Sequence, residues 1–160
     1  MLSKTCCFTG HRVLPPDELP RLKAQLREEI IHLTARGYTY FGAGGALGFD
    51  TLAALTVLEL KRELPQLRLV LILPCEAQCR GWPAKDWNTY KSILNRADKV
   101  VYISRIYDET CMARRNRHMV NNSSVCLCYV NSKTGGAAQT LGYAIRKNRE
   151  IINLGSFSER

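Results

Sequence analysis

Three glycine-bearing turns constrain the fold of this chain most, because each lies where an apolar, strand-like run gives way to a helix. They are Thr9-Gly10-His11-Arg12, Gly42-Ala43-Gly44-Gly45-Ala46-Leu47-Gly48 and Thr134-Gly135-Gly136. Glycine lets the backbone approach a ligand closely, and the first N–H groups of a helix carry partial positive charge. In a parallel sheet these helix starts meet at one edge and form a site for an anionic, phosphate-bearing ligand. Each turn taken alone is also explained as a tight βα connection.

The alternation of apolar runs and helical patterns predicts the fold class. Strands are expected at residues 5–9, 38–43, 67–73, 99–104, 125–130 and 150–154, and helices at 17–36, 50–64, 114–122 and 137–148, with a short helix through Tyr90 and Leu94. Asp17 is expected to cap the first helix, and Gly37 to end it. The pattern predicts an α/β, Rossmann-like fold: a doubly wound, mainly parallel sheet with helices on both faces. We expect a single domain over residues 1–155 and a short C-terminal tail over 156–160.

Length and composition favour a cytoplasmic protein that does not enter a membrane. The chain has 160 residues, of which 46% are hydrophobic and 23% charged, a globular profile. No apolar run approaches the ~20 residues of a membrane span. The first residues, Met1-Leu2-Ser3-Lys4-Thr5, lack the parts of a signal peptide.

The seven cysteines predict no metal site and no disulfide framework. Their number is odd, and four of them, Cys6, Cys7, Cys126 and Cys128, lie in apolar strand-like runs, where a thiol behaves as a small hydrophobe. Cys75 and Cys79 have no second pair or nearby histidine to complete a zinc site. Together with Cys111, these two fall in predicted loops and are candidates for reactive thiols.

The first two turns supply candidate ligand contacts. Thr9, Gly10 and Arg12 offer a hydroxyl, a bare backbone and a planar cation that clamps phosphate; Arg12 is also placed to pair with Asp17 or Glu18. The second turn contributes Gly44, Gly45 and Gly48 in a G-x-G-G-x-x-G run, which is not the usual dinucleotide fingerprint. Asp50 follows, either as a helix cap or as a contact to a ribose hydroxyl or ligand amine.

Two further segments extend the predicted site. After the third strand, Glu76 and Gln78 are candidates to contact a base or sugar, and Glu76 is the weak candidate for acid–base catalysis. Trp82 and Trp87 are expected either to stack on a ring or to pack in a lid or subunit interface.

The phosphate itself is expected between a helix start and an arginine. Gly135, Gly136 and Ala137 open the helix after the fifth strand, and Arg115 with Asn116 lies on the preceding helix. Arg115 is expected to face the N–H groups at the helix start, because it lies one turn from Met112 and Met119, which pack inward.

The ordered set of motifs resembles the YpsA-like branch of the SLOG superfamily, whose relatives include the Lonely-Guy phosphoribohydrolases and the DNA-processing protein DprA. The residues that carry the resemblance are Phe8-Thr9-Gly10-His11-Arg12, Gly42…Gly44…Gly48-Phe49-Asp50, Pro74…Gln78, Ala97-Asp98, Arg115-Asn116…Met119-Val120 and Gly135-Gly136…Thr140…Tyr143-Ala144. The resemblance implies a Rossmann-like domain that binds a nucleotide or nucleotide derivative, such as ADP-ribose or an NAD-like molecule, with no other cofactor required.

Departures from the relatives' motifs bear on activity. The phosphoribohydrolase motif P-G-G-x-G-T-x-E-E ends in an acidic pair, where this chain has Leu141 and Gly142; this argues against the same N-glycosidic cleavage. Within the branch, Ala137 stands where threonine is usual and Ser124 where aspartate is common.

Three hypotheses follow, in order of preference. The first is a nucleotide-binding or nucleotide-sensing protein. The second is an N-glycosidic hydrolase in which Glu76 replaces the missing acidic pair. The third is DprA-like binding of single-stranded DNA, suggested by the formal net charge of +9 but disfavoured because the basic residues are not interleaved with an aromatic platform. A homodimer or higher homo-oligomer is expected.

Overall fold

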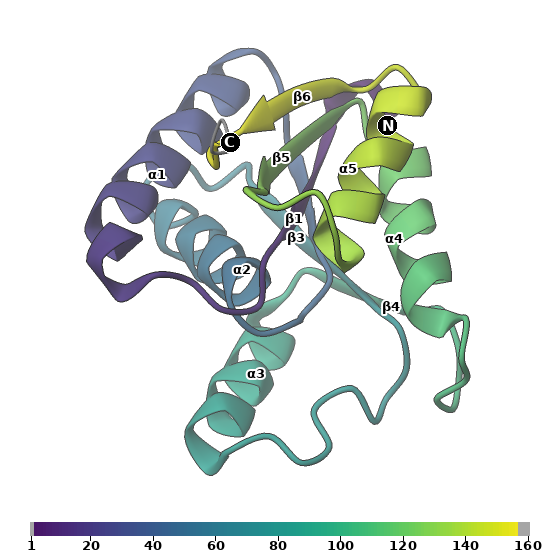
Figure 1. Ribbon diagram of the computed structural model, residues 1–160. Coiled ribbons are helices and arrows are strands. Elements are labelled where there is room, and N and C mark those ends of the chain that lie inside the picture. The colour runs from purple at the N-terminus through teal and green to yellow at the C-terminus, as the bar shows by residue number, and fades with distance from the viewer. Residues whose placement is uncertain (1, 157–160) are drawn as a thin grey trace.

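The computed structural model describes residues 2–156, which form a six-stranded sheet flanked by five α-helices (Figure 1). The strands are β1 (Thr5–Gly10), β2 (Tyr40–Ala43), β3 (Arg68–Leu73), β4 (Lys99–Tyr102), β5 (Val125–Tyr129) and β6 (Glu150–Asn153). The α-helices are α1 (Leu19–Ala35), α2 (Phe49–Leu60), α3 (Ala84–Arg96), α4 (Cys111–Asn121) and α5 (Gly136–Arg146), with 3-10 turns η1 (Leu2–Lys4) and η2 (Pro16–Glu18). Of the expected tail, residues 157–160 lie outside the described part.

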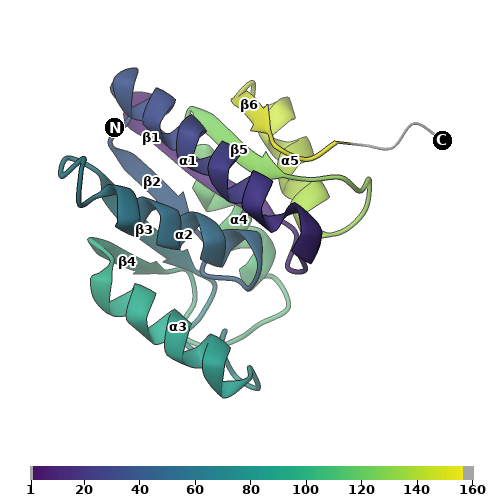
Figure 2. The same cartoon turned by 90° about the vertical axis from the view of Figure 1, so that its left-hand side faces the viewer.

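The sheet is parallel at every strand pair, in the order β4-β3-β2-β1-β5-β6. Helices α1, α2 and α3 cover one face, while α4 and α5 cover the other (Figures 1 and 2). The predicted doubly wound, Rossmann-like fold is confirmed, with a sheet that is wholly rather than mainly parallel. Because the chain runs from β1 toward β4 and then returns to β5 on the far side of β1, the strand order reverses between β1 and β5.

The core forms where apolar helix stripes meet the buried strands. Leu22, Leu26, Ile30 and Leu33 of α1 are all buried, as their near-3.6-residue spacing predicts. Under α1 and α2, the ring of Phe8 in β1 stacks on Phe41 in β2, with centroids 6.0 Å apart. These contacts fix the ends of β1 and β2 relative to the two helices that follow them.

Several helix boundaries differ from the sequence prediction. Helix α2 ends at Leu60 and not near Pro65, because the chain tightens there: Glu63 N–H donates to Leu60 O, an i to i+3 bond. Helix α4 begins at Cys111, three residues earlier than expected. Asp17 is not the cap of α1; it lies in η2, and the cap position is Glu18, whose side chain forms no capping hydrogen bond. Gly37 ends the first helical segment as predicted, with a φ of +98°.

Two other sequence expectations are corrected by burial and helix position. Helix α3 is longer than the short helix expected through Tyr90 and Leu94, and it includes Trp87. Cys75 and Cys111, expected in loops, are buried, and burial raises the pKa of the Cys75 thiol. Neither thiol is therefore placed for reaction with solutes. Among the described residues, no helix has both the length and the apolar character needed to cross a membrane.

Candidate functional site

A cavity of about 230 Å³ lies at the carboxyl ends of the strands, where the strand order reverses between β1 and β5. Three connections form its walls: the turn after β1, the start of α2 after β2, and the start of α5 after β5. The first half of α4 closes it. Ligands of open α/β sheets bind in the crevice at this kind of reversal. We call this hollow the switch-point cavity.

The switch-point cavity brings together residues from four separate sequence segments. Of the predicted ligand residues, its lining contains Thr9, Gly10, Arg12, Asp50, Arg115, Asn116, Gly136 and Ala137. The first N–H groups of α5 at Gly136 and Ala137 have no intrahelical acceptor, and they add the positive end of a helix dipole to the cavity. The structure therefore juxtaposes the predicted helix start and the predicted arginine.

Arg115 is held in place by protein groups and is only 4% exposed. Its Nη1 donates to the carbonyl oxygen of Gly44 and, at 3.4 Å, to Oε1 of Gln78, while its Nε donates to Oδ1 of Asn116 at 2.8 Å. Its Nη2 has no hydrogen-bond acceptor among the described residues. A fixed guanidinium with donors to spare is suited to an anion.

Asp50 is the carboxylate in the lining of the switch-point cavity. It is 7% exposed, and burial raises its pKa to about 6, although the charges of Arg115 and Arg12 and a hydrogen bond from Ala46 N–H at 3.3 Å favour the ionised form. The Asp50 carboxylate in turn opposes the desolvation that lowers the pKa of Arg115. The two side chains form an electrostatically coupled buried pair, and burial brings the ionisation of Asp50 toward neutral pH.

The glycines of the second turn lie outside the lining of the cavity. A Cβ on Gly44 would lie 2.6 Å from Arg115 Nη1 and 2.8 Å from Asp50 Oδ2, so this glycine leaves room for the buried pair. Gly45 packs against Leu73, and Gly48 packs against the backbone of the turn after β1. Their close approaches are to protein atoms, whereas the sequence prediction assigned these glycines to a ligand.

The two predicted residues after β3 also lie outside this lining. Gln78 supports the site from behind, because its Nε2 donates to Gly44 O at 3.2 Å and its Oε1 accepts from Arg115. Glu76 lines a different hollow, beside Trp82 and Trp87. Gly135, with a φ of +100°, is the N-cap residue of α5 and adjoins the lining. The proposed catalytic role of Glu76 therefore has no support from the geometry of the switch-point cavity.

Four lining residues were not assigned to the site from the sequence: Phe8, His11, Ala46 and Met112. His11 belongs to the first predicted turn but was assigned no ligand contact there. Its Nε2 accepts the backbone N–H of Asn131 at 3.0 Å, and its ring lies edge-on to Tyr129. The Nε2 lone pair is thus already used, which makes His11 a positioning group for the β1 turn.

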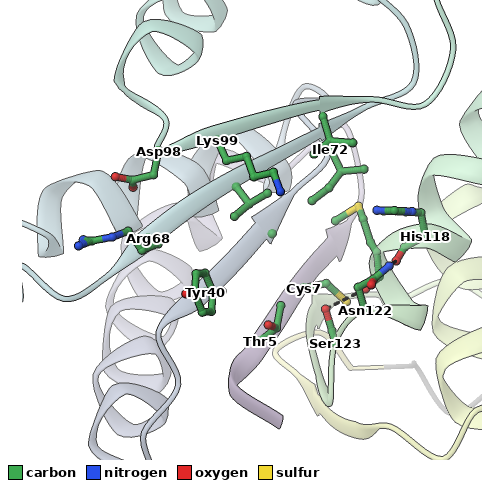
Figure 3. Close-up of a pocket in the computed structure, with 14 residues that line it drawn as sticks. Thr5, Cys7, Tyr40, Arg68, Ile72, Asp98, Lys99, His118, Asn122 and Ser123 are labelled. Atoms are coloured by element: carbon green, nitrogen blue, oxygen red, sulfur yellow. Dashed lines mark hydrogen bonds between the residues drawn. The ribbon is translucent and has the colours of Figure 1, made fainter. Parts of the chain in front are cut away.

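A second cavity, of about 350 Å³, opens on the sheet face that α4 covers only in part. Figure 3 shows Ile72 on the sheet side of this hollow and His118 and Asn122 on the α4 side. Apolar side chains such as Val70 and Val101 form most of its floor. None of the ligand residues predicted from the sequence lines it, so it stands apart from the switch-point cavity.

The described part of the chain contains no candidate metal site. Within residues 2–156, no three histidine, cysteine or acidic side chains are grouped so that they could hold an ion. The lining of the switch-point cavity instead includes Arg12, Arg115 and the start of α5 together with the Asp50 carboxylate, and the arginine and backbone N–H donors suit an anion.

Curated relatives cover most of this chain. YoqJ, an uncharacterized SPbeta prophage-derived protein of Bacillus subtilis, is 27% identical over 137 residues, which span 78% of this chain and 80% of that protein. UPF0398 proteins are similar as well. The one from Brevibacillus brevis is 26% identical over 81% of this chain and 70% of its own length. One from Bacillus thuringiensis is 28% identical over 85% and 75%, respectively.

Solved structures with a similar fold include DNA processing protein A. The protein from Helicobacter pylori, described with a single-stranded DNA binding mode, superposes with a TM-score of 0.68 at 18% identity. The match covers 98% of this chain and 66% of that one, slightly under two thirds. The Streptococcus pneumoniae protein gives 0.67 at 13% identity, over 94% and 50%. The structure of TM1055 gives 0.57 at 19% identity, over 92% and 72%. At these identities the likeness shows the fold alone.

A family model decides the relationship. The model named YpsA, described as the YspA SLOG family, matches residues 15–154, which include all the walls of the switch-point cavity except the turn after β1. This agrees with the ordered motifs noted in the sequence. The chain belongs to the YpsA family of SLOG proteins.

Proposed function

We propose that this protein binds a nucleotide or nucleotide derivative of the ADP-ribose or NAD-like class, with a phosphate held in the switch-point cavity. The observation that carries the proposal is the meeting, at the strand-order reversal, of the α5 start at Gly136 and Ala137 with the fixed guanidinium of Arg115. Arg12, which is exposed, adds a second cation at the rim. Family membership is consistent with this function but does not identify the ligand.

The energetics favour an anion at this position. A hydrogen bond between a charged group and its partner contributes about 1.5–3 kcal/mol, and a helix start adds about 0.3–1 kcal/mol. The phosphate would receive both, from the Nη2 of Arg115 and the N–H groups of α5. A volume of about 230 Å³ suits a phosphate group with part of a ribose, because whole ligand pockets usually occupy roughly 300–1,000 Å³.

The hydrolase alternative is weakened because Glu76 lies outside the cavity. The other alternative, binding of single-stranded DNA, is supported by the formal net charge of +9 and by the fold shared with DNA processing protein A. Both alternatives place a phosphate in the same cavity, so the first experiment asks only whether a small nucleotide binds there.

Substitution of Gly136 by valine is the direct test. A Cβ at Gly136 would meet no protein atom within 4 Å, so the variant should fold normally while its side chain fills the cavity. We expect the parent protein to bind ADP-ribose and Gly136→Val to bind it at least about tenfold more weakly, the loss that about 1.4 kcal/mol represents. Isothermal titration calorimetry measures the affinity, and thermal unfolding checks the fold.

The matched control is Gln139→Val, which places valine on the exposed surface of the same helix, outside the cavity lining. It should bind ADP-ribose like the parent. Equal affinity in Gly136→Val and the parent would remove the switch-point cavity as the phosphate site. Absence of ADP-ribose binding by the parent would remove this ligand class.

Because Asp50 is a buried carboxylate with a raised pKa, we expect the affinity for ADP-ribose to rise as the pH falls from 7.5 to 5. Burial raises the pKa of Asp50 to about 6, and a bound anion disfavours the ionised carboxylate further. Binding therefore takes up a proton, and the affinity should increase by up to about tenfold per pH unit above that pKa. The pyrophosphate of ADP-ribose keeps its charge over this range, so its own titration does not interfere.

Asp50→Asn separates this carboxylate from the other titratable groups of the lining. The variant should bind ADP-ribose more tightly than the parent at pH 7.5 and should show a flatter pH profile. A profile with the same slope in the parent and in Asp50→Asn would show that Asp50 does not face the bound anion.

A further inference from the structure

Exposed aromatic and apolar side chains gather at the carboxyl ends of β3 and β4. Of the seven exposed large hydrophobic residues in the described part of the chain, four lie here: Trp87, Tyr102, Ile106 and Tyr107. Tyr107 is 66% exposed and Ile106 74%. Three of the four line a hollow of about 830 Å³ formed by residues 76–82, residues 105–107 and Trp87. We call this hollow the aromatic basin.

Cations accompany these rings. Arg80 and Arg105 line the aromatic basin, both are exposed, and neither forms an ion pair within residues 2–156. The Lys91 ammonium lies 4.3 Å from the centre of the Trp87 ring. Glu76 is the acidic member of the lining. Flat aromatic faces beside unpaired arginines are the combination that binds a base together with its phosphate.

The aromatic basin adjoins the switch-point cavity through one loop. Gln78, which lies within the basin-forming segment, contacts Gly44 and Arg115 behind the cavity. Both hollows therefore open at the carboxyl edge of the same sheet. Since neighbouring strands are about 4.8 Å apart, β3 and β4 lie about 10 and 14 Å from β1. This separation exceeds the single ribose that joins a mononucleotide's phosphate to its base.

We propose that the aromatic basin stacks a base that is separated from the phosphate in the switch-point cavity by at least one further phosphate unit. The inference rests on the proposed function, and it adds the place of the base, which requires a pyrophosphate-linked nucleotide or consecutive nucleotides of a single strand and not a mononucleotide. These two sources share the same chemistry, a base next to a second phosphate. Arg80 and Arg105 stand beside the rings to receive that charge.

Tryptophan fluorescence tests the inference directly, because the chain has two tryptophans, Trp82 and Trp87, and both line the basin. We expect ADP-ribose to quench this fluorescence and AMP to bind without quenching it, with ADP-ribose about tenfold tighter. A short oligothymidylate is titrated in parallel to distinguish a strand from a free nucleotide. Calorimetry on the same samples gives the affinities.

Two substitutions separate the basin from the cavity. Tyr107→Ala and Trp87→Ala should each weaken ADP-ribose binding toward the affinity of AMP while leaving AMP binding unchanged. Trp87→Phe should keep most of the tighter binding of ADP-ribose relative to AMP, because it keeps an aromatic ring. Ile145→Ala, which also removes an exposed apolar side chain, is the matched control on a distant helix.

The outcomes distinguish this inference from the proposed function. If ADP-ribose binding is lost in Gly136→Val but is unaffected by Tyr107→Ala and Trp87→Ala, the cavity stands and the basin is not a base site. If neither AMP nor ADP-ribose binds, while oligothymidylate quenches the tryptophans and Tyr107→Ala abolishes the quenching, the nucleotide function fails and the base site belongs to a strand. If Trp87→Ala instead dissociates an oligomer in light scattering with ADP-ribose affinity unchanged, a second copy occupies the basin and the inference is overturned.

Discussion

Replacing Arg115 with methionine should lower the free energy of unfolding by about 3–5 kcal/mol, the usual cost of removing one partner of a buried charge pair. Methionine retains much of the length of the side chain but leaves Asp50, which is 7% exposed, with only the weaker influence of Arg12 to favour its ionised form. It also removes the donor to the carbonyl oxygen of Gly44. Urea unfolding measures the change, and Arg117→Met, an exposed position on the same helix, is the control with little expected effect.

The pH dependence of this loss identifies its cause. Asp50 has a folded-state pKa above its ordinary value, so its ionisation costs stability at neutral pH, and the cost is relieved as the pH falls through the folded-state pKa. Without Arg115 that pKa should rise beyond 6, and Arg115→Met should recover stability between pH 7.5 and pH 5. The double variant Asp50→Asn/Arg115→Met should be more stable than the sum of the single effects predicts. An additive, pH-independent loss would mean that the two charges are not coupled.

The sequence predicts the sheet well because continuous apolar runs leave little choice of structure. Phe8 and Leu69 lie in such runs and are buried in strands. The helix ends were less predictable, since they depend on local hydrogen bonds: Thr110 N–H donates to Asp108 at 2.8 Å just before α4, where the sequence pattern gave no clear start.

The candidate site was predicted only in part, because strand order is not readable from the sequence. Thr9 and Gly136 were expected at one sheet edge and meet there, since β1 and β5 are neighbours. Glu76 was expected beside them but follows β3, which lies two strands from β1. The same separation leaves Trp87 and its neighbours free to form the aromatic basin, whereas the sequence showed no aromatic platform among the basic residues.

Burial was the other property that the motifs did not reveal. Arg115 was expected to reach toward a phosphate, and its Nη2 remains available to do so, but its other donors hold the carbonyl of Gly44 and the amide of Gln78. A glycine pattern in a sequence likewise does not say whether the close neighbour is a ligand or the protein itself. Gly48 is the case in which the structure answers this most directly.

Substituting Gly48 with alanine should destabilise the protein by more than about 3 kcal/mol. Gly48 caps α2 with φ +78° and ψ −122°, a backbone conformation that costs other residues about 1–3 kcal/mol. A Cβ there would also lie 2.3 Å from the carbonyl oxygen of Arg12 and 2.5 Å from that of His11, so the turn after β1 would have to move. That movement would break the hydrogen bond from Phe49 N–H to His11 O, now 3.1 Å long, and would displace one wall of the switch-point cavity.

Comparison with Gly81→Ala distinguishes the cost of the positive-φ backbone conformation from the cost of the steric clash that a Cβ at Gly48 would cause. Gly81 has a similar φ of +82°, but a Cβ at that position would meet nothing within 4 Å, so its replacement should cost only about 1–2 kcal/mol. Urea unfolding of both variants gives the difference, and ADP-ribose titration should show binding lost in Gly48→Ala but kept in Gly81→Ala. Equal destabilisation of the two variants would mean that backbone strain alone explains Gly48. A Gly48→Ala protein that remains stable and binds like the parent would show that the turn after β1 is not fixed by its packing on α2.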